Sequence, residues 1–152
     1  MSEYTKHQQV VGLKRLKKLL NLLSTVVEDK EFYFGRFAQT KMETPKLDLW
    51  KTCSMRHPCM TNGCAMGWAS TIFREVKLKY NPFLKSMNVV DLKTNNEGYQ
   101  VAQNLFRLDN WDARYLFDPY SSKLGTEASR EQVCQHIQKF LLSRASELGV
   151  QL

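Results

Sequence analysis

Residues 6–27 read KHQQVVGLKRLKKLLNLLSTVV, and this stretch carries the clearest folding signal in the chain. Its apolar residues recur at intervals of three and four, at Leu13, Leu16, Leu20, Leu23 and Val27. That spacing places them on one face of an α-helix, the face that packs against a core. Lys14, Lys17 and Lys18 fall away from this face, and we interpret them as the solvated side. A long N-terminal helix over residues 6–27 is therefore predicted.

A second long helix is predicted near the other end of the chain, over residues 126–148. Its inward positions are apolar at helical spacing, at Val133, Ile137, Phe140, Leu141 and Ala145. Gly149 follows, and glycine commonly ends a helix because it adopts the left-handed backbone conformation without strain.

Shorter helices are expected between these two. Residues 64–77 carry a stripe of alanine and bulky apolar side chains at helical spacing, with Thr61 or Asn62 as a suitable N-cap. Residues 99–106 and 111–117 predict two more helices, with a capping aspartate or asparagine between them.

The remaining segments suggest little regular structure. Residues 31–37, EFYFGRF, are rich in aromatic side chains and suit a short strand. Residues 39–63 have no period and indicate a long loop, and residues 80–88 indicate a short turn. The predicted fold class is mostly α, with α+β possible. We expect a single compact domain over residues 1–152, with long N- and C-terminal helices, shorter central helices and a short strand or small sheet near 31–38.

The composition bounds the class of protein. The chain has 152 residues, of which 43% are hydrophobic and 24% are charged. These values are typical of a soluble globular domain and exclude a disordered chain, a collagen and a long coiled coil. No apolar run reaches the roughly 18–20 residues that a membrane helix needs, and we expect no membrane partner. The four cysteines are expected to be free thiols or ligands in a cytoplasmic protein.

The charge is distributed unevenly along the chain. Lysine and arginine outnumber aspartate and glutamate by 22 to 15, which gives a formal net charge of +7. The excess lies within the first ninety residues, because residues 91–152 hold 7 basic and 8 acidic side chains. This asymmetry favours one positive side and an anionic partner, although a mildly basic surface also serves solubility.

Cys53, His57, Cys59 and Cys64 fall within twelve residues, and all four are of types that bind zinc. Known finger and ribbon sites favour C-x2-C pairs, which the spacing C-x3-H-x-C-x4-C does not contain. We therefore expect no metal and no cofactor.

Cys64 also allows a catalytic interpretation. A cysteine at a helix N-terminus lies at the positive end of the helix dipole, which lowers its pKa and favours the nucleophilic thiolate. A cysteine hydrolase needs a base within hydrogen-bond reach as well, and His57 is the one histidine nearby in the sequence. Because no residue is evidently placed to orient His57, we prefer a buried Cys64 and assign no catalytic residue.

The same segment is the candidate ligand site. A loop that leads into a helix exposes backbone N–H groups at the positive end of the helix dipole, which attracts anions. Trp50, Trp68 and Trp111 offer rings on which a nucleotide base stacks. The candidate ligand-binding residues are Lys51, Arg56, His57, Asn62, Gly63, Cys64 and Trp68.

Three blocks of the chain carry a resemblance to a known family. Residues 62–69, NGCAMGWA, precede VAQNLFRL at 101–108 and LFDP at 116–119. In this order they resemble small uncharacterised phage-encoded proteins, in which a short cysteine-containing stretch leads into G-[WH]-A before a helical segment. The resemblance implies a phage source and a protein that acts in the bacterial cytoplasm. It carries over no activity and no site residue.

From these features we expect a non-enzymatic phage accessory protein that binds an anionic small molecule, such as a nucleotide signal made by host defence. Two alternatives stay open. The first is an inhibitor that binds a host protein or nucleic acid with its basic face. The second is a cysteine-dependent enzyme around Cys64. The sequence does not fix the oligomeric state.

Overall fold

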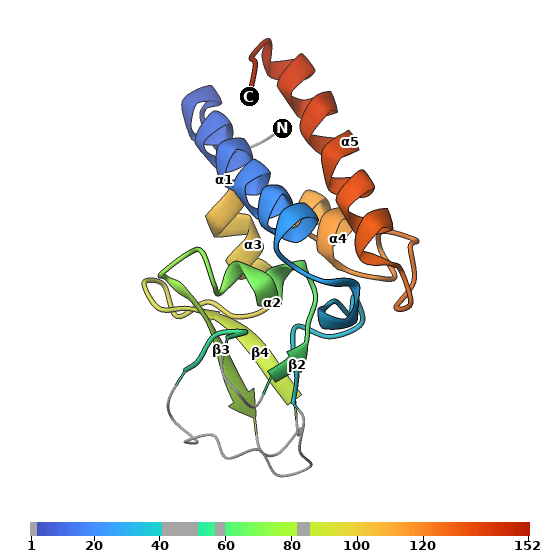
Figure 1. Ribbon diagram of the computed structural model, residues 1–152. Coiled ribbons are helices and arrows are strands. Elements are labelled where there is room, and N and C mark those ends of the chain that lie inside the picture. The colour runs from blue at the N-terminus through green and yellow to red at the C-terminus, as the bar shows by residue number, and fades with distance from the viewer. Residues whose placement is uncertain (1–2, 41–51, 57–59, 82–85) are drawn as a thin grey trace.

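The computed structural model describes residues 3–40, 52–56, 60–81 and 86–152, and it has a mostly helical α+β fold. Figure 1 shows the two long helices side by side at one end, the short helices in the middle and a β-hairpin at the other end. Along the chain the elements are α1 (Lys6–Thr25), η1 (Asp29–Glu31), β1 (Gln39–Thr40), β2 (Met60–Asn62), α2 (Ala65–Ala69), β3 (Val76–Asn81), β4 (Ser86–Asp91), α3 (Tyr99–Phe106), α4 (Asn110–Phe117) and α5 (Arg130–Leu148).

The predicted N-terminal helix is confirmed. It begins with a capping box, in which the Thr5 hydroxyl accepts a hydrogen bond from the Gln8 N–H and the Gln8 side chain accepts one from the Thr5 N–H. The helix ends at Thr25, two residues before the predicted boundary. The whole predicted apolar face is buried, including Val27 just beyond the helix. Each leucine fully removed from water contributes about 2 kcal/mol, so this face is a main source of stability.

The predicted C-terminal helix is confirmed as α5, but it begins at Arg130 rather than at residue 126. A second capping box explains this boundary, because the Ser129 hydroxyl accepts from the Gln132 N–H and the Gln132 side chain accepts from the Ser129 N–H. Gly149 ends the helix with φ of 67°, as expected.

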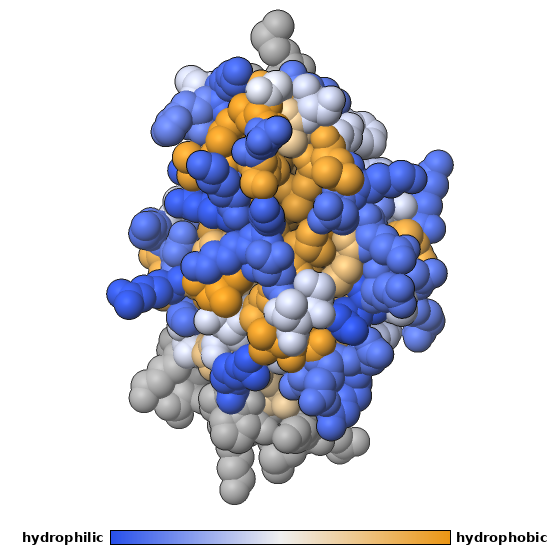
Figure 2. Space-filling model, turned by 45° about the horizontal axis from the view of Figure 1, so that its top comes forward, coloured by the Kyte–Doolittle hydropathy of each residue, from blue (hydrophilic) through white to orange (hydrophobic). Residues whose placement is uncertain are grey.

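Helices α1 and α5 run in opposite directions (Figure 1). Side-chain hydrogen bonds join them near both ends of α5. The Arg130 guanidinium donates to the Leu23 carbonyl at 2.7 Å and to the Asp29 carboxylate at 2.8 Å. The Lys17 ammonium donates to the Leu152 carbonyl at 2.8 Å. Figure 2 shows hydrophobic side chains gathered over these two helices, with hydrophilic ones on either side.

The predicted helix over residues 64–77 is wrong beyond Ala69. The Ser70 hydroxyl donates to the Gly67 carbonyl at 2.6 Å and the Thr71 hydroxyl to the Trp68 carbonyl at 2.8 Å, so side chains satisfy the last carbonyls of α2. The chain then changes from a helical period to the alternation of a strand, in which Val76 and Leu78 are buried.

The predicted turn over residues 80–88 is also wrong in its extent. Strands β3 and β4 form an antiparallel hairpin, in which Val76 pairs with Asp91 and Asn81 with Ser86. Residues 82–85 lie outside the described residues. The lysines of β3 alternate with buried residues, and this alternation is a period of two that a helical stripe through Val76 conceals.

The small sheet predicted near residues 31–38 is displaced by a few residues. Strand β1 pairs antiparallel with β2, Gln39 opposite Asn62, and Phe32 forms an isolated parallel bridge with Gly63. The segment between them is irregular, although Phe34 and Ala38 are buried.

The central helices are confirmed, α4 with a slightly earlier start than predicted. The N-cap of α4 is Asp109, whose carboxylate accepts from the Asp112 N–H at 2.8 Å. Phe106 of α3 packs edge-to-face on Phe73 and against Phe117 of α4, so one aromatic row joins the middle layer. In the described part of the chain, no helix is both long enough and apolar enough to cross a membrane.

Gly12 tests the packing of α1 on α3. A Cβ at this position would overlap the Phe106 carbonyl oxygen. We expect Gly12→Ala to lower the free energy of unfolding by about 1–3 kcal/mol, although alanine gains about 1 kcal/mol over glycine in helix propensity. Urea unfolding followed by circular dichroism measures the change.

The control is Asn21→Ala, at an exposed position of the same helix, where only the helix propensity changes. A Gly12→Ala variant more stable than the wild type would show that α1 and α3 do not approach this closely.

Candidate functional site

The start of α2 was the expected anion site, and its backbone amides are engaged within the protein. The Gly63 N–H donates to the Glu31 carbonyl at 3.1 Å, and the Cys64 N–H donates to the Arg36 carbonyl at 3.0 Å. Helix α2 has five residues, with Cys64 as its N-cap rather than Thr61 or Asn62. A Cβ at Gly67 would overlap the Phe37 carbonyl oxygen, so the Phe37 backbone packs directly against α2. The amides of Gly63 and Cys64 are therefore not available to an external anion in this arrangement.

Two side chains of the expected site lie together, but not as a stacking platform. Trp68 is 2% exposed, and its indole N–H donates to the Glu31 carbonyl at 3.0 Å. The Arg56 guanidinium lies 5.4 Å from the centre of the Trp68 ring. Because Trp68 is buried and Arg56 covers its ring, this tryptophan cannot stack on a nucleotide base. Asn62 is half-buried, and its side-chain oxygen has no hydrogen-bond partner among the described residues.

Other residues of the expected site fall in segments outside the described residues. Lys51 and His57 lie outside the described residues, as do Trp50 and Cys59. Within the described ranges, no group of three or more histidine, cysteine, aspartate or glutamate side chains is arranged to hold a metal ion. Two of the four candidate zinc ligands are outside those ranges, so the expected absence of zinc stays a prediction.

The catalytic interpretation of Cys64 requires a lowered pKa, and the structure shows the opposite shift. Burial raises the pKa of this thiol from 9.0 to about 11, and nearby backbone N–H groups offset only part of the effect. Desolvation disfavours the thiolate more than the end of so short a helix favours it. Cys64 is therefore a protonated core residue at neutral pH, as the preferred interpretation of its burial required.

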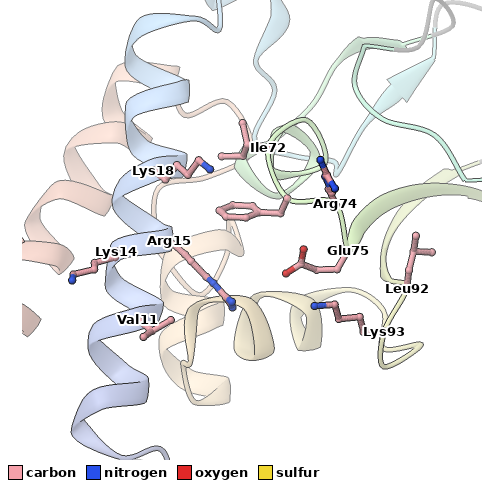
Figure 3. Close-up of a pocket in the computed structure, with 10 residues that line it drawn as sticks. Val11, Lys14, Arg15, Lys18, Ile72, Arg74, Glu75, Leu92 and Lys93 are labelled. Carbon is pink, nitrogen blue, oxygen red and sulfur yellow. The ribbon is translucent and has the colours of Figure 1, made fainter.

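A different part of the molecule forms an open groove of about 840 Å³ (Figure 3). One wall is α1, and the other consists of the segment 72–75 after α2 together with the turn after β4. Its described lining residues are Val11, Lys14, Arg15, Lys18, Ile72, Phe73, Arg74, Glu75, Leu92 and Lys93. We call this feature the basic groove, since five of these side chains are cationic and one is anionic.

The cations come from both walls of the basic groove. In Figure 3 the ends of Arg15, Lys18 and Lys93 are directed into the space between the walls, whereas those of Lys14 and Arg74 point away from it. The Arg15 guanidinium donates to the Leu105 carbonyl at 3.1 Å, which fixes this side chain. The Lys18 ammonium lies 5.9 Å from the centre of the Phe73 ring.

The wall opposite α1 is held by backbone hydrogen bonds. The Leu92 N–H donates to the Glu75 carbonyl at 2.8 Å, which joins the two ends of the hairpin. The Lys93 N–H donates to the carboxylate of the buried Asp91 at 2.8 Å. The positions of Glu75 and Lys93 therefore follow from the register of β3 and β4.

Sequence reasoning missed the basic groove. It treated Lys14 and Lys18 as a solvated face, and it placed Arg74 and Glu75 inside a helix. The one available signal was the positive charge of the first ninety residues, which α1 and the segment 72–75 share. No local pattern predicts that Lys93, far along the chain, joins them.

A second hollow, of about 790 Å³, lies between α1 and α5 and has a different character. Lys139 is the one lysine or arginine among its described lining residues. His136 also lies there, but a ring nitrogen is hydrogen-bonded to the Tyr115 carbonyl at 2.7 Å. The basic groove is therefore the stronger candidate for an anionic ligand.

No protein-family model, curated protein or solved structure matches the chain. The resemblance to small phage proteins therefore stays a prediction, and the candidate site depends on its own geometry.

Burial of Cys64 predicts slow alkylation in the native protein. With a pKa of about 11 instead of 9.0, its thiolate fraction at pH 8 is about a hundredfold lower than that of an ordinary cysteine. We expect iodoacetamide to modify Cys64 at least that much more slowly in the native state than in guanidinium chloride, as measured by peptide mass spectrometry.

The same pKa predicts a stability trend. Only the unfolded state releases this proton between pH 9.0 and about 11, so the contribution of Cys64 to folding stability falls as the pH rises through that range. In the iodoacetamide experiment, equal labelling rates in the native and unfolded states would contradict the burial of Cys64.

Proposed function

We propose that this protein is a non-enzymatic binder of anionic small molecules and that the basic groove is its ligand site. The observation that carries the proposal is the charge of the groove, whose lining has five cationic side chains and one carboxylate, with the ends of Arg15, Lys18 and Lys93 directed into the space between the walls (Figure 3). Among the described residues, none of Lys14, Lys18, Arg74 and Lys93 forms an ion pair. Lys18 and Lys93 are therefore available to a ligand in the groove, whereas Lys14 and Arg74 point away from it (Figure 3).

The shape of the groove supports a small organic anion. Its volume of about 840 Å³ lies within the range of roughly 300–1,000 Å³ typical of small-molecule sites. The groove is also lined by the apolar side chains of Val11, Ile72, Phe73 and Leu92. A nucleotide combines the two features that this lining suits, phosphate groups for the cations and a flat base for the apolar floor.

Two observations support a binding protein over a cysteine-dependent enzyme. Cys64 is buried, and its pKa is raised. His136 is engaged with Tyr115 through both its ring nitrogen and its ring face. His57 lies outside the described residues, so neither observation concerns that histidine.

The biological role that we propose follows from the phage resemblance. A phage accessory protein in the bacterial cytoplasm with this groove would sequester an anionic nucleotide signal of host defence. The proposal of a phage source rests on the sequence blocks alone, whereas the proposal of anion binding rests on the groove.

A second candidate function is the binding of a host nucleic acid or protein by the basic face. Lys14 and Arg74 favour it, because both are exposed and point away from the groove in Figure 3. Duplex binding would depend steeply on salt, since each neutralised phosphate releases counterions.

The pair Lys18→Ala and Lys17→Ala tests the site. The two lysines are neighbours on α1, but Lys18 lines the groove, whereas Lys17 bonds to Leu152. We expect Lys18→Ala to weaken the binding of inorganic tripolyphosphate about tenfold, the equivalent of one charge-assisted hydrogen bond. Lys17→Ala should bind like the wild type. Isothermal titration calorimetry at two salt concentrations measures both.

Arg56→Ala extends the comparison to the start of α2. Equal weakening by Lys17→Ala and Lys18→Ala would indicate a diffuse basic surface rather than the groove. Weakening by Arg56→Ala alone would return the site to the cysteine-rich segment.

A further inference from the structure

We propose that Glu75 determines the specificity of the basic groove and that the ligand is a nucleotide whose base donates hydrogen bonds, with guanine as the best match. This inference rests on the proposed anion-binding function and adds a class of ligand to it. Glu75 is the acidic residue among the described lining side chains of the groove.

The position of Glu75 directs its carboxylate into the basic groove (Figure 3). Glu75 is half-buried in the wall opposite α1, immediately before β3, and its carbonyl accepts from the Leu92 N–H at 2.8 Å. In Figure 3 its carboxylate points from this wall into the groove, between the ends of Arg15 and Lys93. Within the described part of the chain it has no ion pair within 4.0 Å. Glu75 is thus held at the site without a structural partner.

The carboxylate of Glu75 differs in its hydrogen bonding from the cationic side chains of the groove. The lysine and arginine side chains of the groove only donate hydrogen bonds, whereas an ionised carboxylate only accepts them. For a ligand that is anionic throughout, such as a phosphate chain, Glu75 is repulsive and lowers affinity. For a ligand that places N–H groups against it, the same carboxylate is complementary, and it rejects ligands that lack those donors.

Purine bases differ in the hydrogen-bonding groups that they present to a carboxylate. Guanine presents N1–H and the 2-amino group side by side, which matches the two oxygens of one carboxylate. Hypoxanthine retains N1–H but lacks the 2-amino group. Adenine places an acceptor nitrogen beside its amino group, so one carboxylate oxygen faces a lone pair. A carboxylate in a cationic groove therefore ranks the three bases as guanine, hypoxanthine and adenine.

The groove also has apolar side chains on which a base can rest. Leu92 is 52% exposed and Ile72 is half-buried, and both line the same groove. Lys18 already covers Phe73. A base held by Glu75 would rest on Leu92, at the end of the groove away from Lys18, with its phosphates toward Arg15 and Lys18 on the α1 side (Figure 3).

The test compares Glu75→Gln with the wild type by isothermal titration calorimetry against GTP, ITP, ATP and inorganic tripolyphosphate. Glutamine keeps the size of the side chain but replaces one acceptor oxygen by a donor. We expect the wild type to bind GTP about tenfold more tightly than ITP, and ITP more tightly than ATP. Glu75→Gln should weaken GTP about tenfold, remove the preference among the bases and tighten tripolyphosphate.

The outcomes separate this inference from the proposed function. Tripolyphosphate binding that depends on Lys18, with GTP, ITP and ATP bound equally by the wild type, would overturn the role of Glu75 and leave anion binding intact. Tightening of all four ligands by Glu75→Gln would mean that the carboxylate only repels. Absence of binding by every ligand would overturn both proposals. Leu92→Ala, with its unfolding curve as a control, should weaken GTP and not tripolyphosphate.

Discussion

The burial of one face of α1 is the constraint on which the rest of the structure depends. This face packs on α5 along its length, approaches α3 so closely that residue 12 must lack a side chain, and covers α2. Burial of the leucines fixes the rotation of the helix about its axis. The lysines and the arginine between them are then directed to fixed places, Lys17 toward the C-terminal residues and Arg15 and Lys18 toward the segment 72–75.

Much of the helical frame could be predicted from the sequence, because long amphipathic helices report their period over many residues. The hairpin could not. Its first strand shares Val76 with a plausible helical stripe, and the side chains of Ser70 and Thr71 that end α2 are common within helices. Where an apolar pattern covers only a few residues, tertiary contacts decide between helix and strand. Here the pairing of β3 with β4 decides it.

The candidate site was harder to predict than the fold, and the reason is electrostatic. The sequence shows the net positive charge of the chain. The local charge of the groove, however, depends on which segments the fold brings together, and these are α1, the segment after α2 and the turn after β4. The sequence predicts a site in the cysteine-rich segment because the residues of that segment lie close together along the chain. There the protein satisfies its own amides with the carbonyls of Glu31 and Arg36, and burial keeps the Cys64 thiol protonated.

The aromatic row from Phe73 through Phe106 to Phe117 has a consequence for the thermodynamics of association. Phe73 is both the first ring of that row and a lining residue of the groove, so this wall is anchored in the buried core although Lys18 covers the ring itself. A ligand that binds against this wall would order little additional backbone, because the core already holds the wall in place. The loss of conformational entropy would fall on the long side chains at the rim, chiefly Lys18 and Lys93, at about 0.5–1.5 kcal/mol for each one that is immobilised.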